Sequence, residues 1–258
     1  MIRFQKNVKN KERKKKQQKT KILMEPLEKL KGWLLNPENK ISSVVDFDPS
    51  ADRLYPFDFT AANLELTNNI LTDTSVFSDW ITKKLEDTGS RYGIGGYCEH
   101  RTIYSRSVHF DTAEEPRRLH LGVDIWGAAG TPVYNFHDAI VHSFRNNDHF
   151  GDYGATIILK YELNGLTLYA LYGHLSLASI AGLKTGQFIA GGTLFAAFGI
   201  PAENGDWPPH LHFQLMFDMQ EKEGDYPGVC QFSNRAVYLN NCPDPGFILN
   251  HTFNIPAE

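Results

Sequence analysis

Apolar and polar residues alternate along two segments in the second half of the chain. In residues 120–125 the odd positions are apolar, and the even positions hold His120, Gly122 and Asp124. In residues 210–217 the odd positions are again apolar, and both histidines of a His-Leu-His run fall on even positions. Successive side chains of a strand point to opposite faces, so each segment predicts a strand with one core face and one polar face.

The pattern predicts a β-rich region that starts near Tyr92. Short runs of β-branched and aromatic residues alternate there with turn residues such as Gly, Asn and Pro. Asn164-Gly165 lies between two apolar runs and is a specific hairpin signal, because both residues tolerate the positive φ of a type I′ turn. The predicted strands cover residues 102–109, 120–126, 132–134, 139–145, 155–161, 166–173 and 211–217.

Helical spacing is found toward the N-terminus. The leucines of residues 24–34 recur with helical spacing, and an Asn-Pro pair ends the pattern. A second helix is expected over residues 76–85, with Ser75 as N-cap and Gly89 closing it. We therefore expect a mainly β fold with N-terminal helices (β/α+β), built on an antiparallel sheet. The expected divisions are a basic disordered tail (1–23), a helical or irregular extension (24–112), a β core (113–220) and a loop-rich C-terminal tail (221–258).

The length and composition allow one large domain, or one domain with extensions. With 258 residues, of which 41% are hydrophobic, the chain can bury a core. It contains no run of about 18 apolar residues, so we expect no membrane span. Cys98, Cys230 and Cys242 form no Cys-x-x-Cys pair. We expect free thiols in a reducing compartment, with a Cys230–Cys242 disulfide as the open alternative.

The net charge of −4 conceals an asymmetry. Residues 1–22 carry ten Lys/Arg and one acidic residue, whereas the rest carries 16 basic and 29 acidic residues. The acidic body argues against nucleic acid as a partner. The basic run is typical of a solvated tail, although it could bind phosphate or anionic lipid, and Met24 shortly after it is an alternative start. No apolar stretch of about 7–15 residues follows, so we expect no secretory signal and, by default, a cytoplasmic protein.

The polar faces of the two alternating strands form a candidate metal site. His120, Asp124 and His212 offer two nitrogens and one carboxylate, which suits zinc with a fourth position left for water. Water in such a site ionises near neutral pH. His210, two residues from His212, could then accept the proton of the water as general base. His174, at the end of an apolar strand, could stabilise the oxyanion or protonate the leaving nitrogen.

Neighbouring polar residues have simpler interpretations. Gln214 follows on the same strand face as His212 and could orient it by a hydrogen bond. We expect His109 to be structural. Arg117-Arg118 could meet a substrate carboxylate, although exposed arginines at the start of a strand are commoner. The other histidines are expected at the surface or in structural hydrogen bonds: His100, His137, His142, His149 and His251.

Six short segments, in order over about a hundred residues, resemble the M23 (lysostaphin/LytM-like) zinc metallopeptidases. The segments are His120-Leu-Gly-Val-Asp124, Gly130-Thr-Pro-Val133, Tyr153-Gly154, Leu171-Tyr-Gly-His-Leu-Ser176, Gly186-Gln187 and Pro209-His-Leu-His-Phe213. The resemblance implies a compact antiparallel β domain with an open groove, zinc on the three ligands named above, and catalytic roles for His174 and His210. It also implies endopeptidase cleavage in bacterial peptidoglycan, at glycyl-glycine bridges or D-amino-acid cross-links. A peptidoglycan-derived peptide would then be the partner and the cell envelope the location.

Three features depart from the usual pattern of that family. Gln214 stands where Glu is common, and residues 200–208 replace the usual Gly/Thr-rich loop, which would reshape the groove wall. Members that act on the cell wall normally carry an export signal, and none is visible in this sequence. Residues 24–112 could act as a latency segment in the mouth of the groove or as a packing extension, and the sequence leaves both open.

Two alternatives to a hydrolase also stay open. Two histidines and a carboxylate describe a mononuclear iron(II) oxygenase site as well. That chemistry has no evident use for the further imidazoles of His174 and His210. The other alternative is a non-catalytic domain that binds a cell-wall peptide or a partner protein. The presence of all five polar positions favours a catalyst, whereas the missing export signal separates such a catalyst from its usual substrate.

Overall fold

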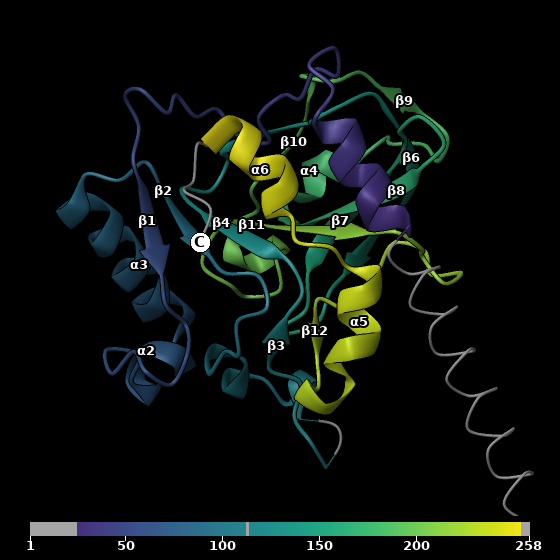
Figure 1. Cartoon of the computed structure of the whole chain (residues 1–258). Coiled ribbons are helices and arrows are strands. Elements are labelled where there is room, and N and C mark those ends of the chain that lie inside the picture. Colours follow the sequence, from purple (N-terminus) through teal and green to yellow (C-terminus); the bar gives the residue numbers. More distant parts are fainter. Residues whose placement is uncertain (1–24, 112–113, 254–258) are drawn as a thin grey trace, which may run out of the picture.

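A large sheet organises the computed structural model, which describes residues 25–111 and 114–253 (Figure 1). Neighbouring strands of this eight-stranded sheet are antiparallel, except that β1 and β2 are parallel. In spatial order the strands are β1 (Leu54–Phe57), β2 (Tyr92–Gly95), β4 (Val123–Trp126), β11 (His210–Met216), β8 (Thr167–Leu175), β7 (Gly154–Glu162), β6 (Ala139–Asn147) and β9 (Phe188–Ile189). Two smaller sheets pair β5 (Pro132–Tyr134) with β10 (Leu194–Ala197), and β3 (Leu119–His120) with β12 (Val229–Cys230). The predicted fold, mainly antiparallel β with N-terminal helices, is confirmed.

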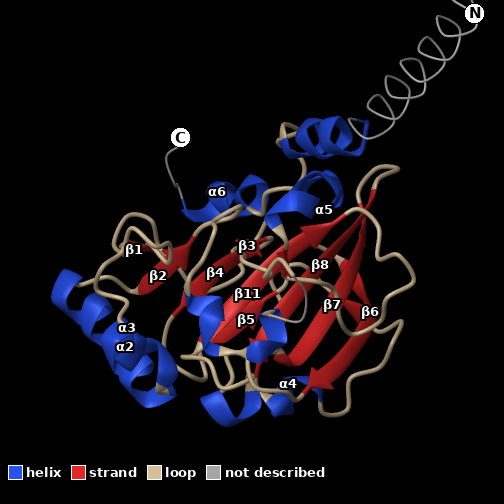
Figure 2. Ribbon diagram, turned by 90° about the horizontal axis from the view of Figure 1, so that it is seen from below, coloured by secondary structure: helices blue, strands red, loops and turns tan. Residues whose placement is uncertain are grey.

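Helices lie around the margins of the sheet. Figure 2 shows α2 and α3 beside β1, at one edge of the sheet. The helices are α2 (Asn68–Thr72), α3 (Thr74–Thr88), α4 (Leu177–Ile180), α5 (Arg235–Asn241) and α6 (Gly246–Phe253), with 3₁₀ turns η1 (Ile103–Arg106), η2 (Val108–Phe110), η3 (Pro201–Glu203) and η4 (Phe232–Asn234). Residues 25–34 are helical as predicted, while the expected basic tail (1–23) lies outside the described residues. In the part of the chain that the structure describes, no helix has the length and apolar character needed to cross a membrane.

The hairpin between β7 and β8 forms where the Asn-Gly pair predicted it. Asn164 and Gly165 both have positive φ, at 50° and 84°. Leu163 and Leu166 exchange two backbone hydrogen bonds across the turn, of 2.8 and 3.1 Å. This turn fixes the register of two long central strands, one of which ends at the candidate site.

Helix α3 begins earlier than the sequence predicted. The side chain of Asp73, not that of Ser75, caps the helix, accepting hydrogen bonds from the backbone N–H groups of Ser75 and Val76. A carboxylate there satisfies two of the N–H groups that a helix start leaves unpaired, so the helix begins at Thr74. Gly89 closes the helix in the left-handed conformation, at φ 61°, as predicted.

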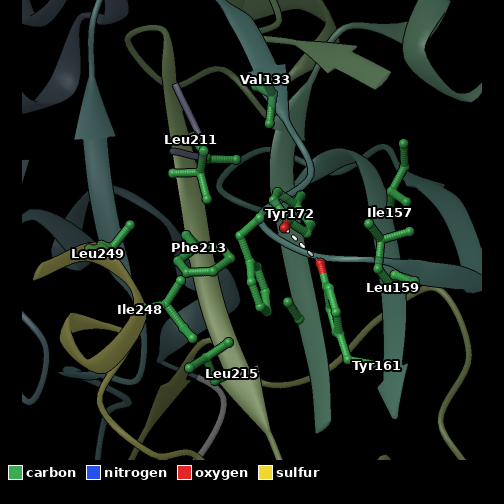
Figure 3. Packing of buried hydrophobic residues seen from close by; sticks show 14 of the residues in the cluster. Val133, Ile157, Leu159, Tyr161, Tyr172, Leu211, Phe213, Leu215, Ile248 and Leu249 are labelled. Atoms are coloured by element: carbon green, nitrogen blue, oxygen red, sulfur yellow. Dashed lines mark hydrogen bonds between the residues drawn. The ribbon is translucent and has the colours of Figure 1, made fainter. Parts of the chain in front are cut away.

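One face of the large sheet packs against the main hydrophobic core. The odd-numbered residues of β11 lie there, next to Tyr161 of β7 and Tyr172 of β8 (Figure 3). Tyr161 donates its hydroxyl proton to Asn135 Oδ1 at 2.7 Å and lies 2.9 Å from the Tyr172 hydroxyl, so these buried polar groups are paired. Helix 25–34 and α6 cover this core with Trp33 and Ile248 among other residues. The polar residues of β4 and β11 therefore point to the opposite face.

Three predicted segments differ from the structure. Residues 102–109 form the 3₁₀ turns η1 and η2 rather than a strand, because the Ser107 side chain accepts a hydrogen bond from the His109 N–H and starts a new turn. The predicted strand 120–126 is split into β3 and β4, which pair with different partners. Residues 235–241 and 246–253 of the expected loop-rich tail are helices, and α6 buries apolar residues in the main core.

The extension before the expected core is built into the sheet. β1 and β2 come from residues 54–95, and β2 pairs with β4 through Ile94 opposite Ile125. The backbone of Arg101 and His120 adds further links, to Arg118 O and Glu99 O respectively, each at 2.9 Å. The strand that carries Asp124 therefore has the extension on one side and β11 on the other.

Candidate metal centre

Strand register brings the candidate ligands together. His212 of β11 lies opposite Asp124 of β4 on one side and opposite Gly173 of β8 on the other. The chain between β3 and β4 leaves room for the imidazole, because a Cβ at Gly122 would lie 2.6 Å from His212 Cε1. A glycine is therefore required at position 122 for the close approach of the ring.

His120, Asp124 and His212 form a compact, buried group whose candidate ligand atoms all lie within 4.8 Å of one another. His120 Nε2 is 3.0 Å from His212 Nδ1, and Asp124 Oδ1 is 3.3 Å from His120 Nε2 and 3.0 Å from His212 Nδ1. Three donor atoms directed at one another can all bind one cation between them. Two imidazole nitrogens and one carboxylate oxygen also match the donor set of a catalytic zinc site.

The hydrogen bonds of both ligand imidazoles leave the correct nitrogen free. His120 Nδ1–H donates to Gly96 O at 2.9 Å, and His212 Nε2–H donates to Gln214 Oε1 at 3.0 Å. Because these oxygens accept hydrogen bonds, the opposite nitrogen of each ring keeps its lone pair for a metal. The bond between Gln214 and His212 is the one predicted from their shared strand face.

His174 and His210 lie beside this group and contact each other. Their ring centroids are 4.1 Å apart, and His210 stacks on Trp126 at 3.9 Å. Each Nδ1–H donates to a backbone carbonyl, that of Asn204 for His174 and that of Pro208 for His210, both at 2.7 Å. Each ring therefore presents an unprotonated Nε2, which can accept a proton.

The backbone of His174 has a conformation that is rare for residues other than glycine. Its φ is 62°, in the left-handed region. Hydrogen bonds hold it on both sides, since its N–H donates to Tyr153 O and its carbonyl accepts from Gly199 N–H, both at 2.9 Å. Such conformations persist where the surrounding structure fixes them, and they concentrate at functional sites.

Burial keeps the imidazoles of His120, His174 and His210 neutral. It lowers the pKa of His120 and of His210 to about 4. Burial also lowers the pKa of His174 well below the ordinary value, and the neighbouring His210 adds to the effect. Burial alone would raise the pKa of the Asp124 carboxyl, but His120 and Arg101 beside it hold that pKa well below its usual range. At neutral pH His120 thus offers a neutral nitrogen and Asp124 a charged oxygen, the forms that bind metals.

An open cavity of about 160 Å³ lies over this group. Asp124, His212, His174 and His210 line this cavity. Its other walls include Arg101, Tyr104, His109, Phe110, Arg117, Asp152, Tyr153, Trp207, Lys222 and Asp225. The loop 200–208, which the sequence marked as unusual, supplies Trp207 to this wall, as well as the Asn204 carbonyl that fixes His174.

Arg101 was not predicted from the sequence as part of the site, and two of the neighbouring residues line the cavity although other roles were expected for them. Arg101 is fully buried and donates a hydrogen bond from Nη1 to Asp124 Oδ2. No spacing pattern connects it to the ligands, because the contact arises from the folding of an irregular segment. His109, expected to be structural, lines the cavity, as does Arg117, whereas Arg118 pairs with Asp111 at 2.6 Å.

The remaining histidines and the cysteines lie outside the site. His137 Nδ1 lies 3.1 Å from Lys40 O and His142 Nδ1 lies 2.8 Å from Ser143 Oγ, in structural hydrogen bonds as expected. None of His100, His137, His142, His149 and His251 lines the cavity. Cys98, Cys230 and Cys242 are free thiols, which excludes the Cys230–Cys242 disulfide in this structure.

Comparisons with known proteins agree with the motif pattern. Residues 118–224 match the sequence model of Peptidase family M23. The L-Ala--D-Glu endopeptidase of Bacillus subtilis (strain 168) is 30% identical over 115 residues, which are 43% of this chain and 33% of that relative. The chain therefore spans only about a third of the length of this curated relative.

Two solved structures are similar to this chain over part of its length. A zinc containing peptidase from Vibrio cholerae is 29% identical with a TM-score of 0.30, over 38% of this chain and 27% of that one. The catalytic domain of lysostaphin from Staphylococcus simulans is 19% identical with a TM-score of 0.37, over 62% of this chain and 96% of that domain.

Proposed function

We propose that the chain is a zinc-dependent endopeptidase of the M23 type that hydrolyses peptides of the peptidoglycan type; residues 118–224 match the sequence model of Peptidase family M23. The observation that carries the proposal is the convergence of ligand atoms of His120, Asp124 and His212 within 4.8 Å, with Asp124 and His212 lining an open cavity. Structural zinc sites are usually closed by four protein ligands, whereas this set has three ligands beside two further imidazoles, which is the arrangement of a catalytic site with an open position.

In this proposal His120 Nε2, Asp124 Oδ1 and His212 Nδ1 would hold the zinc. The chemistry that zinc supplies in such a site is a lowered pKa for a coordinated water and polarisation of the scissile carbonyl. The hydrogen bonds to Gly96 and Gln214 orient the two imidazoles toward the ion.

His210 and His174 supply the proton transfers. The bare Nε2 of His210 accepts a proton from the attacking water, and the stacked Trp126 fixes the plane of the ring. Neutral His174 offers only a lone pair at Nε2, because its proton is on Nδ1. It can therefore stabilise an oxyanion or protonate the leaving nitrogen only after it has taken up a proton. The contact between the two rings provides a neighbour from which that proton can come.

The substrate class rests on the family and on the relative named for cleavage between L-Ala and D-Glu. Peptides that contain D-amino acids are typical of bacterial cell walls. The cavity has carboxylates (Asp152, Asp225) and cations (Arg117, Lys222) in its walls, so it suits a polar peptide better than an apolar one.

The first experiment measures metal content by plasma mass spectrometry on the untagged full chain, and then peptide cleavage by the metal-loaded protein. We expect one zinc per chain, kept in His210→Ala and lost in Asp124→Ala. The His210→Ala protein should lose about 10²–10⁴-fold in turnover on glycyl-glycine, L-Ala–D-Glu or D-amino-acid cross-link peptides. The matched control is His137→Ala, whose side chain lies outside the cavity.

Three results would overturn the proposal. Stoichiometric iron with 2-oxoglutarate turnover would indicate an oxygenase. No metal, even when zinc is supplied, would indicate a domain that binds without cutting. Loss of zinc in His210→Ala would mean that a ligand has been mistaken for a base.

A further inference from the structure

We propose that Arg101 is a positioning residue of the metal centre: it binds one carboxylate oxygen of Asp124 and so presents the other, Oδ1, to the metal. Arg101 lies outside residues 118–224, in the extension. The inference rests on the proposed function, because it concerns how the same site holds its ion.

The two oxygens of Asp124 have different partners. Oδ1 faces His120 and His212, at 3.3 and 3.0 Å. Oδ2 accepts the hydrogen bond from Arg101 Nη1, and both side chains are almost completely buried. A carboxylate held in this way has one oxygen free, so it binds a cation through that oxygen alone. The fourth position of a zinc site then stays open for water.

Arg101 is itself held from several directions. Its Nε donates to Glu99 Oε2 at 2.6 Å, and Nη1 lies 3.3 Å from the Tyr104 hydroxyl. Its guanidinium lies over the Phe59 ring, 5.2 Å from the centroid. The structure also makes room for it, because a Cβ at Gly95 would lie 2.6 Å from Arg101 Nη2. A buried guanidinium with this many partners is held in one orientation. Through its hydrogen bond to Oδ2 it also fixes the orientation of the Asp124 carboxylate.

The same segment of the extension orients a second ligand. The Gly96 carbonyl accepts the hydrogen bond from His120 Nδ1–H, and the backbone N–H of His120 donates to Glu99 O at 2.9 Å. Residues 96–101 therefore fix two of the three ligands. The stretch that matches the family does not contain this part of the site.

Two electrostatic effects of Arg101 oppose each other. A cation next to a ligand repels a metal ion, whereas an oriented carboxylate binds it better. Glu99 forms an ion pair with Arg101 and partly offsets its positive charge, so the repulsion of the metal ion is weakened. Partners of metal ligands typically contribute about 10–100-fold to metal affinity. We therefore expect orientation to dominate and Arg101 to strengthen metal binding.

The test compares full-length wild type with Arg101→Gln and Arg101→Lys, by zinc competition against a chelator and by the visible spectrum of the cobalt(II)-loaded protein. Arg101→Gln should bind zinc about 10–100-fold more weakly. With Oδ2 released, Asp124 can bind through both oxygens, so the cobalt bands should lose intensity as the coordination number rises. Arg101→Lys keeps the positive charge but lacks the planar guanidinium that also reaches Glu99. Its zinc affinity should therefore lie between those of wild type and Arg101→Gln.

The matched control is Arg91→Gln, which removes a guanidinium that bridges Asp46 and Asp52 far from the ligands in the chain. Its zinc affinity and cobalt spectrum should equal those of wild type. A folded Arg101→Gln protein with wild-type affinity and spectrum would overturn the inference. If Arg101→Gln does not fold, Glu99→Gln decides: a smaller change in the same direction supports the inference, and an unchanged spectrum overturns it. Wild type that binds metal but cleaves no peptide would refute the proposed function alone, because the metal readouts do not depend on turnover.

Discussion

Each histidine of the site has one ring nitrogen engaged by an oxygen that can only accept, so its tautomer is fixed by the protein. For His120, His174 and His210 that oxygen is a backbone carbonyl, and for His212 it is the side chain of Gln214. The free nitrogen then points at the metal position or into the cavity. Preorganisation of this kind means that metal binding need not first rearrange the rings.

At this scale the sequence predicted side-chain identities better than their partners. Strand alternation placed His212, Gln214 and Asp124 on one face, and the register of β4 and β11 brings them together. Backbone carbonyls leave no signature in a sequence, so Gly96 as a partner of His120 could not be predicted. Arg101 was missed for a related reason, since its contact with Asp124 depends on how an irregular segment folds back.

Replacing Gln214 tests the orientation of His212. In Gln214→Leu the His212 Nε2–H loses its acceptor in a buried position, so the ring is held less firmly and zinc should bind about 10–100-fold more weakly. Gln214→Glu keeps an acceptor oxygen and should retain or exceed wild-type affinity. Chelator competition measures both variants, and equal affinities for Gln214→Leu and wild type would refute the role.

At the scale of elements, prediction succeeded where one periodicity was sustained. β6, β7 and β8 were recovered because alternation and turn residues agreed over long runs. Residues 102–109 also contain apolar residues, but Ser107 starts a turn by accepting a backbone hydrogen bond, and the segment becomes two 3₁₀ turns. α6 was missed because its burial depends on contacts with distant segments of the main core.

The start of α3 provides a direct test of a misplaced cap. Asp73→Ala should lower the free energy of unfolding by about 1 kcal/mol, because the N–H groups of Ser75 and Val76 lose their acceptor. Ser75→Ala, which removes the cap that the sequence suggested, should change it by less than about 0.5 kcal/mol. Urea denaturation of both variants measures the difference, and a larger loss in Ser75→Ala would restore the sequence-based assignment.

At the scale of the whole molecule, burying the ionisable groups of the site lowers the stability of the fold, and the hydrophobic core must offset this loss. Besides three hydrophobic clusters, the fold buries four histidines of the site together with Asp124 and Arg101. Buried ionisable groups of this kind are retained for function more often than for stability. A metal ion bound only by the folded chain would offset part of this cost.

Acidification of the metal-free protein should lower its free energy of unfolding. The pKa values of His120 and His210 are lowered to about 4 by burial, whereas an unfolded histidine titrates near 6.5. Between these values the unfolded chain binds more protons than the folded chain, so the free energy of unfolding falls as the pH drops from about 6.5 to 4. Each of the two histidines contributes about 3 kcal/mol to this fall.

Urea denaturation of the chelator-treated protein at pH 7 and pH 4.5 measures the effect. His210→Gln, which cannot be protonated in this range, should lose less stability on acidification than wild type. The same pH dependence in both proteins would contradict the assignment of His210 as a neutral, buried group.

The pairing of β2 with β4 has a consequence for how the molecule meets other chains. Without β2, the sheet would end at β4. The backbone N–H and C=O groups of Val123–Trp126 on that side would then be unpaired and could form hydrogen bonds with a strand of another chain. β2 and β1 cover this edge, and helices α2 and α3 lie beside the new one (Figure 2). The extension thus protects the ligand-bearing strand from edge-to-edge aggregation.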